Sequence, residues 1–291
     1  MLIQNSFIPG NEGGKLYLVA TPIGNLEDMT YRAINTLKEA DFIAAEDTRQ
    51  TRKLLTHFAI EGPLVSYHEH NKLRSGEEIL HKLQEGKTIA LVSDAGLPAI
   101  SDPGEELVKE AIALGIPVIP IPGPNAALSA LIASGLSTKG FVFRGFLPRG
   151  KKDLWTALES LKYYPETLIF YESPHRIEKT LKEMKEVLGS RQVALARELT
   201  KRYEEFIRGD IDEVLAYLRG LEEIRGEFTV IVSGSTEVKE EEGEAWWAEL
   251  DISAHVESYL ERGMDKKGAL KKTAEDRGVP KREVYNIFHK S

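Results

Sequence analysis

Cysteine is absent from the 291 residues of this chain. Its absence excludes thiol nucleophiles, zinc sites built from cysteine and iron–sulfur clusters, and it is compatible with a reducing compartment. Long apolar runs are absent as well, since no stretch approaches the roughly 18 apolar residues that a membrane-spanning helix needs. The segment from Met1 to Gly14 has neither a basic start nor an apolar run, so we expect no signal peptide. These absences favour a soluble, cytoplasmic protein.

A basic excess is also lacking, because 38 Lys and Arg residues stand against 46 Asp and Glu residues, for a net charge of −8. A protein coated by nucleic acid over its whole surface normally carries a basic patch or a high pI, so this balance argues against that class. The charge is nevertheless uneven. Residues 237–251 hold seven acids and one lysine, whereas residues 262–291 hold nine basic and four acidic residues. Any nucleic-acid contact is therefore expected to be local.

Strand-like apolar runs alternate with helical patterns along most of the chain, which predicts mainly parallel sheets covered by helices on both faces. Three prolines and Gly123 interrupt the pattern near the middle and mark a domain boundary. We expect an α/β protein with two α/β domains of mainly parallel sheets and a small helical C-terminal appendage. The expected parts are a flexible N-terminal arm (1–14), an N-terminal α/β domain (15–123), a C-terminal α/β domain (124–236), an acidic linker (237–245) and a helical, helix-turn-helix-like tail (246–291).

The individual elements follow from the same periodicities. The expected strands are Lys15–Ala20, Phe42–Ala45, Leu64–Tyr67, Thr88–Ser93, Val118–Ile121, Phe141–Phe146, Thr167–Tyr171, Val193–Ala196 and Phe228–Val232. The expected helices are Thr30–Ala40, Arg74–Gln84, Glu105–Leu114, Asn125–Ser134, Lys152–Leu161, Arg176–Leu188, Asp210–Leu218, Lys266–Arg277 and Arg282–His289.

The loops that follow the strands are where a parallel α/β sheet binds its ligands. Three of these loops, at 20–26, 93–104 and 121–126, are rich in small residues and proline, and Asp94 supplies a carboxylate. The sequence contains no G-x-G-x-x-G fingerprint, no phosphate-binding P-loop and no G-x-S-x-G elbow. The residues therefore predict a small-molecule site of unspecified chemistry, and tight turns between buried elements remain the alternative.

These loops resemble those of the tetrapyrrole methylases, the class III methyltransferases, and more specifically their ribosomal-RNA branch, the 16S rRNA (cytidine(1402)-2′-O)-methyltransferases. Six motifs in the same order carry the resemblance. They are Leu18–Asp28, Ala45–Arg49, Val92–Pro98 with Ser101–Gly104, Pro122–Asn125, Phe170–Arg176 and Arg197–Lys201. The resemblance implies S-adenosylmethionine bound in a cleft between two α/β domains, usually within a homodimer, and ribose methylation of 16S rRNA in the small ribosomal subunit. The alternatives are a small-molecule methyltransferase of the tetrapyrrole type and a non-catalytic RNA-binding assembly factor.

The family pattern also implies which residues bind the cofactor. They are Pro22, Asp94, Ala95, Gly96, Leu97, Pro124, Asn125, Phe170, Tyr171, Leu195, Ala196 and Thr229. The tetrapyrrole enzymes tend to carry a glycine-rich first loop where this chain has Thr21-Pro22-Ile23-Gly24, a departure that fits the RNA branch.

Methylation of a ribose hydroxyl is helped by a general base. The candidates that follow strands are Glu46, Asp47, His68, His70 and Glu172. We favour Glu46 and Asp47, because carboxylates beside Arg49 suit both proton removal and phosphate binding. Asp47 or Thr48 as the N-cap of a helix is the competing interpretation. His68 and His70 are two residues apart, a spacing that occurs in many metal sites, but no metal is expected here. The alternatives for this segment are an exposed loop and a contact with RNA.

RNA contacts are expected from Arg49 and His68, and from four cations in the tail, Lys271, Lys272, Lys281 and Arg282. The two tail helices are joined by Gly278-Val279-Pro280 and resemble a helix-turn-helix, in which such cations bind phosphates. Short helical hairpins also arise for packing or dimer contacts, which is the alternative for this segment. The Trp246-Trp247 pair is expected to lie in a helix that anchors the tail to the body, with nucleobase stacking as the alternative.

Overall fold

The computed structural model describes residues 1, 3–6, 13–237 and 246–289. The chain divides into two compact units, Met1–Glu237 and Val238–Ser291, and each is described here by itself. Apart from Glu237, the acidic linker expected at 237–245 lies outside the described residues, as do residues 2 and 7–12 of the expected N-terminal arm. The other expected domain limits therefore stay predictions.

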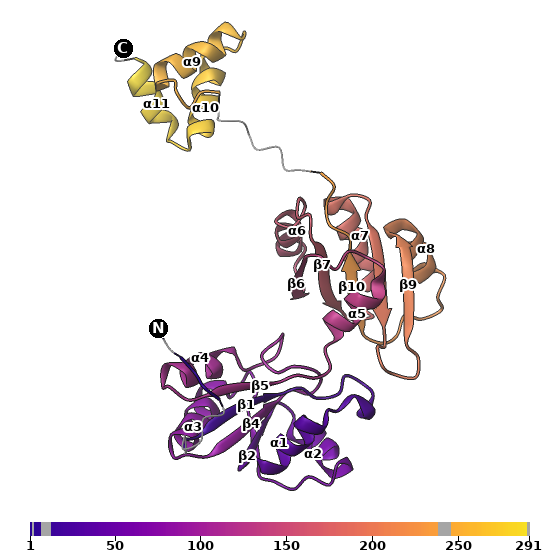
Figure 1. The fold of residues 1–291 in the computed structure, drawn as a ribbon. Coiled ribbons are helices and arrows are strands. Elements are labelled where there is room, and N and C mark those ends of the chain that lie inside the picture. Colours follow the sequence, from indigo (N-terminus) through magenta and orange to yellow (C-terminus); the bar gives the residue numbers. More distant parts are fainter. Residues whose placement is uncertain (2, 7–12, 238–245, 290–291) are drawn as a thin grey trace. The chain divides into compact units, whose positions relative to one another are not determined.

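The first sheet of Met1–Glu237 is wholly parallel, as the alternating pattern predicts (Figure 1). Its strand order is β3-β2-β4-β1-β5. The strands are β1 (Lys15–Val19), β2 (Phe42–Ala45), β3 (Leu64–Ser66), β4 (Thr88–Val92) and β5 (Val118–Ile121). Parallel strands require crossover connections, and four helices supply them: α1 (Tyr31–Glu39), α2 (Thr48–His57), α3 (Lys72–Gln84) and α4 (Glu105–Ala113).

The helices cover both faces of this sheet because each carries one apolar stripe. Leu37 of α1 and Leu55 of α2 pack into the core on one face, and Ile79 of α3 packs into the core on the other. Side-chain caps fix where two of these helices begin. The Thr30 hydroxyl accepts from the Ala33 amide before α1, and the Asp47 carboxylate accepts from the Arg49 amide before α2.

The second sheet is mixed, and the expectation of a mainly parallel sheet is wrong for this domain. Its order is β6-β7-β10-β8-β9. Only β6 (Phe141–Phe146) and β7 (Thr167–Glu172) pair in parallel. The three other pairings, among β7, β8 (Gln192–Arg197), β9 (Glu205–Asp210) and β10 (Phe228–Val232), are antiparallel. The short connection from β8 to β9 explains part of this, since it cannot contain the crossover that a parallel pair needs.

Helices cover the two faces of the second sheet unequally (Figure 1). The helices α6 (Lys151–Glu159), α7 (Ile177–Leu188) and α8 (Ile211–Arg219) contribute Leu158, Leu181 and Leu215 to a large core on one face. On the other face the single helix α5 (Ala126–Ser134) packs over a smaller cluster that includes Ile169 and Ile231. A helix of nine residues covers only part of a five-stranded face.

The C-terminal unit has its own core. Three helices, α9 (Ile252–Glu261), α10 (Lys266–Arg277) and α11 (Lys281–Phe288), pack around Val256, Leu270 and Val284. Gly278 ends α10 in the left-handed conformation, with φ of 63°, which favours glycine at this position. Both helices expected here are observed to within one residue. Trp246 and Trp247 pack against His255 inside this unit, and they lie in a turn rather than a helix.

Candidate functional site

The loops after β1 and β4 are joined at the carboxyl edge of the first sheet. The Thr21 and Gly96 backbones exchange two hydrogen bonds, with N–O distances of 2.9 and 3.0 Å. The Thr21 hydroxyl also donates to the Ser93 carbonyl at 3.0 Å. Gly96 has φ of +82°, and a Cβ there would lie 3.4 Å from the Ile23 side chain. The positive φ favours glycine at this junction of the two loops.

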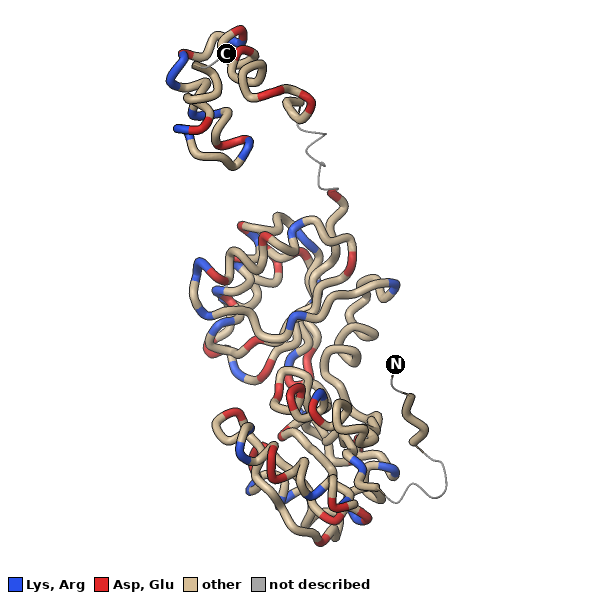
Figure 2. The backbone as a smooth tube through the Cα atoms, turned by 90° about the vertical axis from the view of Figure 1, so that its left-hand side faces the viewer, with Lys and Arg blue, Asp and Glu red and all other residues tan. Residues whose placement is uncertain are grey.

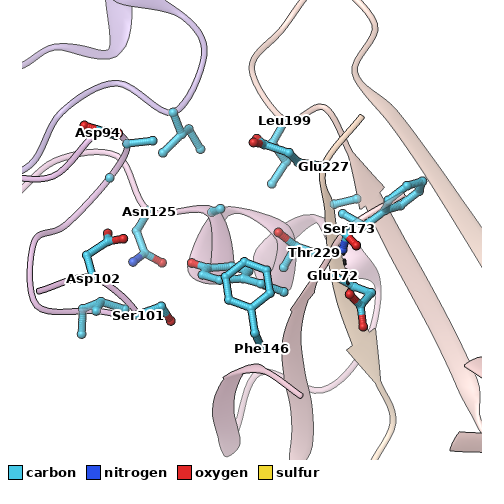
Figure 3. A pocket seen from close by; sticks show the side chains of 18 of the residues that line it. Asp94, Ser101, Asp102, Asn125, Phe146, Glu172, Ser173, Leu199, Glu227 and Thr229 are labelled. Atoms are coloured by element: carbon cyan, nitrogen blue, oxygen red, sulfur yellow. Dashed lines mark hydrogen bonds between the residues drawn. The ribbon is translucent and has the colours of Figure 1, made fainter. Parts of the chain in front are cut away.

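A cavity of about 560 Å³ lies beside this junction, and residues of both α/β halves line it (Figure 3). The first sheet contributes loop residues after β1, β2 and β4, and the second sheet contributes residues of β6, β7, β8 and β10. Ten residues named from the sequence line the cavity: Glu46, Asp94, Ala95, Gly96, Leu97, Asn125, Tyr171, Glu172, Ala196 and Thr229. The structure thus brings together residues that are far apart in the sequence.

Other predicted cofactor residues do not line this cavity. Phe170 and Leu195 are fully buried in the large core, because successive strand side chains alternate between faces and only Tyr171 and Ala196 point to the cavity side. Phe170 and Leu195 could therefore contact a cofactor only through their backbone atoms. Pro124 lies close to the cavity residue Gly96, because a Cβ atom added to Gly96 would lie 3.7 Å from the Pro124 carbonyl oxygen. Pro22 lines a second cavity instead.

Five carboxylates line the cavity. Glu172 and Glu227 are paired with Arg176 and Lys201, whereas Glu46, Asp94 and Asp102 have no Lys, Arg or His partner within 4.0 Å among the described residues. Burial raises the pKa of Asp102 to about 6, and the charges of Glu46 and Asp94 add to the shift. Burial also raises the pKa of Glu46, with Asp94 contributing and His68 opposing. The cavity therefore has an uncompensated negative charge that suits a cationic ligand.

Asp47, the second predicted catalytic residue, is the N-cap of α2 and does not line the cavity. Its carboxylate forms an ion pair with Arg49 at 3.3 Å, and hydrogen bonds from Arg49 hold the pKa of Asp47 below its usual range. The Asp47 amide donates to Asp94 Oδ1 at 3.1 Å, which links the start of α2 to the cavity wall. The capping interpretation thus describes its position.

Glu172, another candidate base, is committed to internal contacts. Its carboxylate accepts from the Thr180 hydroxyl at 2.7 Å and from the Ser173 amide at 2.8 Å, and Arg176 lies 3.4 Å away. These bonds fix the turn between β7 and α7 at the edge of the cavity. A structural role in this turn accounts for all of these contacts of Glu172.

His68 and His70 lie in the loop after β3, with ring centroids 6.0 Å apart. The His68 amide donates to the Asn71 side chain, and His68 Nδ1 is buried without a hydrogen-bond partner. Among the residues that the structure describes, no three His, Cys, Asp or Glu side chains are grouped as metal ligands. His70 is exposed.

The four predicted tail cations are exposed on α10 and α11. Lys271 and Lys272 lie 3.6 and 3.1 Å from Glu275 and Asp276 in the same helix. Lys281 donates to the carbonyl of Lys267. Acidic and basic positions are interspersed over Met1–Glu237 (Figure 2), so that unit carries no coat of one sign.

Sequence reasoning missed several residues that line the cavity, including Ser101, Asp102, Phe146 and Glu227. The motif Ser101–Gly104 was a signal for two of these. Backbone strain marks this loop and the loop after β8, because Ala99, Ser101, Glu198 and Thr200 are non-glycine residues with φ between 50° and 65°.

Comparisons with known proteins identify strong similarities. The family model of tetrapyrrole (corrin/porphyrin) methylases matches residues 15–215. Two curated proteins named ribosomal RNA small subunit methyltransferase I are similar over nearly the whole chain. The protein from Halalkalibacterium halodurans is 60% identical over 289 residues, 99% of each chain, and that from Bacillus subtilis is 57% identical over 286 residues, 98% of each.

A solved structure shares the fold. The uroporphyrin-III C-methyltransferase of Thermus thermophilus in complex with S-adenyl homocysteine is 21% identical, with a TM-score of 0.53, and the match covers 75% of this chain and 97% of that one. No helix among the described residues has the length and apolar character to span a membrane.

Proposed function

Because the chain belongs to the family of tetrapyrrole (corrin/porphyrin) methylases, we propose that it transfers a methyl group from S-adenosylmethionine to the ribose 2′-oxygen of cytidine 1402 in 16S ribosomal RNA. The observation that carries this proposal is the identity of 60% and 57% to ribosomal RNA small subunit methyltransferases over essentially the full chain, tail included. The partner is 16S rRNA, free or in the small ribosomal subunit, and such a substrate places the reaction in the cytoplasm.

The cavity fits the cofactor in size and charge. Its volume of about 560 Å³ lies within the range of small-molecule sites, roughly 300–1,000 Å³. S-adenosylmethionine carries a sulfonium and an ammonium group, and the unpaired carboxylates of Glu46, Asp94 and Asp102 match that charge. When bound, the cofactor supplies an electrophilic methyl group. Asp94, the 95–97 backbone, Asn125 and the strand residues Tyr171, Ala196 and Thr229 would hold it, with Pro22, Pro124, Phe170 and Leu195 next to them.

The residues of the chain have two tasks in this reaction. The first is to hold the ribose hydroxyl in line with the methyl group, because positioning alone can contribute several kcal/mol, of the roughly 7–11 available to well-oriented reactions. The second is to accept the hydroxyl proton. Glu46 and Asp102 are the carboxylates of the cavity whose pKa is raised, so they are the candidates for that proton. Asp47 contributes by capping α2 and by bonding to Asp94.

RNA binding is proposed at two places. Arg49 at the start of α2 is 88% exposed, and His68 lies near Glu46. In the tail, Lys271, Lys272, Lys281 and Arg282 are available to phosphates, and this local placement accommodates the negative charge of the whole chain.

We also propose a homodimer. The face of the second sheet under α5 is only partly covered, and Leu128 and Ile132 on the outer side of α5 are exposed. These two residues are four apart and form one apolar stripe. A second copy of the chain would cover this stripe, because in a twofold dimer the same face of each subunit packs against the other.

Methyl transfer is tested with purified protein, tritium-labelled S-adenosylmethionine and small ribosomal subunits that lack their methylations. We expect label in 16S rRNA at one ribose, which then resists alkaline cleavage. Naked 16S rRNA and a porphyrinogen serve as the competing acceptors. Label in the porphyrinogen alone would establish the small-molecule alternative, and tight cofactor binding with no label in any acceptor would support the assembly factor.

A further inference from the structure

A second cavity, of about 320 Å³, lies next to the cofactor cavity in Met1–Glu237. Asp94 lines both cavities. Thr21 lines the second and Gly96 the first, so the two-bond backbone bridge between Thr21 and Gly96 stands at the boundary. A ligand that extends from the cofactor cavity past Asp94 would therefore enter the second cavity.

One face of α2 forms a wall of this second cavity. The helix contributes Gln50, Thr51, Lys53, Leu54 and His57, and these residues recur mainly at spacings of three and four and so share a face. Arg49, Lys53 and His57 follow one another at intervals of four residues along the helix. Leu55 is buried in the core on the inner side of the helix, and Arg49, Lys53 and His57 are exposed on its outer side.

The charge of this wall is one-sided. The helix α2 contains three cations, Arg49, Arg52 and Lys53, together with His57, and it contains no Asp or Glu. Among the described residues of this helix, only Arg49 has a carboxylate within 4.0 Å, its own cap Asp47. Lys53 donates to the Gln50 amide oxygen at 3.2 Å, so its charge is not neutralised. Asp94 is the single carboxylate that lines this cavity in the described part of the chain.

The lining is suited to a nucleoside as well as to a phosphate. Pro22, Leu26 and Leu54 give apolar surface, and Gln50 offers both a donor and an acceptor. Sequence-specific RNA recognition takes place on unstacked single-stranded nucleotides, whose bases need such mixed pockets while cations hold the backbone.

We propose that the α2 face and the second cavity bind a single-stranded RNA segment next to the methylated nucleotide, with a backbone phosphate at Lys53 and His57. This inference rests on the proposed function, since it assigns the path of the RNA strand toward the cofactor cavity. It extends the predicted contact at Arg49 by two turns of helix.

The test uses the charge reversal Lys53→Glu in the full-length protein, with Lys179→Glu as the matched control. Lys179 is exposed on α7 and lines neither cavity. Binding of a labelled RNA hairpin that contains the target loop is measured by fluorescence anisotropy at several salt concentrations, without cofactor. We expect Lys53→Glu to weaken binding at least tenfold and to reduce the magnitude of the log–log salt slope by about 1, as loss of one phosphate contact predicts.

Two further measurements show whether a loss of binding comes from the phosphate contact itself. Lys53→Arg keeps the charge and should bind nearly as wild type, and all variants should bind S-adenosylmethionine with affinities within about twofold by calorimetry. Equal RNA affinity and salt slope for Lys53→Glu and Lys179→Glu would overturn the inference. So would a loss confined to intact subunits, because that would identify a protein partner. If wild type binds the hairpin through Lys53 yet methylates no RNA, the proposed function fails while the RNA surface stands.

Discussion

Asp102 is the residue whose environment most clearly predicts a pH dependence. Its pKa is raised to about 6 by burial and by the charges of Glu46 and Asp94, and the carboxylate accepts a proton only when it is ionised. The methylation rate of wild type should therefore fall as the pH drops below about 6. We expect Asp102→Asn to reduce kcat by roughly 10²–10⁴, the usual contribution of general base catalysis, and to remove this acid limb.

Glu46→Gln provides the control for that prediction. The Glu46 charge helps to raise the pKa of Asp102, so its removal should lower that pKa and move the acid limb to lower pH. Carbon-13 NMR of the Asp102 carboxyl in ligand-free protein measures the same shift without turnover. An acid limb that survives in Asp102→Asn, at an unchanged pH, would assign the proton to another group.

At single residues, the sequence predicted the cavity better than it predicted the role of each side chain. Asp94 was found because ligands bind in the loops that follow the strands of a parallel sheet, whereas Asn125 and Thr229 were found through the resemblance to the tetrapyrrole methylases. Phe170 and Leu195 were predicted as cofactor residues together with their neighbours Tyr171 and Ala196. A sequence motif alone does not show toward which face of the sheet each side chain points. Asp102 was missed because the conformation of its loop requires positive φ at two non-glycine residues, Ala99 and Ser101. No local sequence pattern predicts such a conformation.

At the scale of elements, the helices and strands that the periodicities predicted are observed to within about two residues. The helix α2 was considered only as the helix that Asp47 or Thr48 would cap, and α9 was not predicted individually. The strand β9 was missed, because Glu205–Asp210 lacks the alternation of a half-buried strand and Phe206 and Ile207 are adjacent. That omission also concealed the antiparallel β8–β9 pair. Strand direction in the second sheet depends on pairings between distant segments, which local periodicity does not encode.

The three-helix tail contains a buried histidine that links its stability to pH. His255 is 0% exposed, stacks on Trp247 at 5.1 Å between ring centroids and accepts from Arg277 Nε at 3.1 Å. Burial and the charges of Arg277 and Arg262 lower its pKa, which the Asp276 carboxylate opposes. The folded tail thus favours neutral His255, while the unfolded tail takes up a proton near pH 6.5. The contribution of neutral His255 to the free energy of unfolding should be complete above pH 6.5. It should decrease as the pH drops from 6.5 toward the pKa of His255 in the folded state.

Urea unfolding followed by tryptophan fluorescence measures this effect. Two of the three tryptophans lie in the tail, so a Trp155→Phe background reports on the tail alone. The midpoint should be lower at pH 5.5 than at pH 7.5. His81→Gln, which replaces an exposed histidine of α3, should leave the difference intact. A midpoint independent of pH would mean that His255 is protonated equally in both states.

At the scale of the whole molecule, the prediction concerns the uncovered part of the second sheet. A nine-residue helix leaves Ile132 79% exposed, and burial of such a side chain contributes about 1.5–3 kcal/mol. Sedimentation equilibrium should therefore give twice the chain mass of 32.5 kDa for wild type. A lysine at this position would place a charge in the centre of a twofold interface opposite its own copy, so Ile132→Lys should shift the mass to that of a single chain.

Leu73→Lys is the matched control for this experiment, because Leu73 on α3 is 78% exposed and differs from Ile132 mainly in location. It should leave the mass at two chains, with both variants retaining the far-ultraviolet circular dichroism of wild type. If Leu73→Lys dissociates the protein and Ile132→Lys does not, the copies meet through the first domain instead. A single-chain mass for wild type at micromolar concentration would remove the dimer, and the α5 stripe would then need a partner other than this chain.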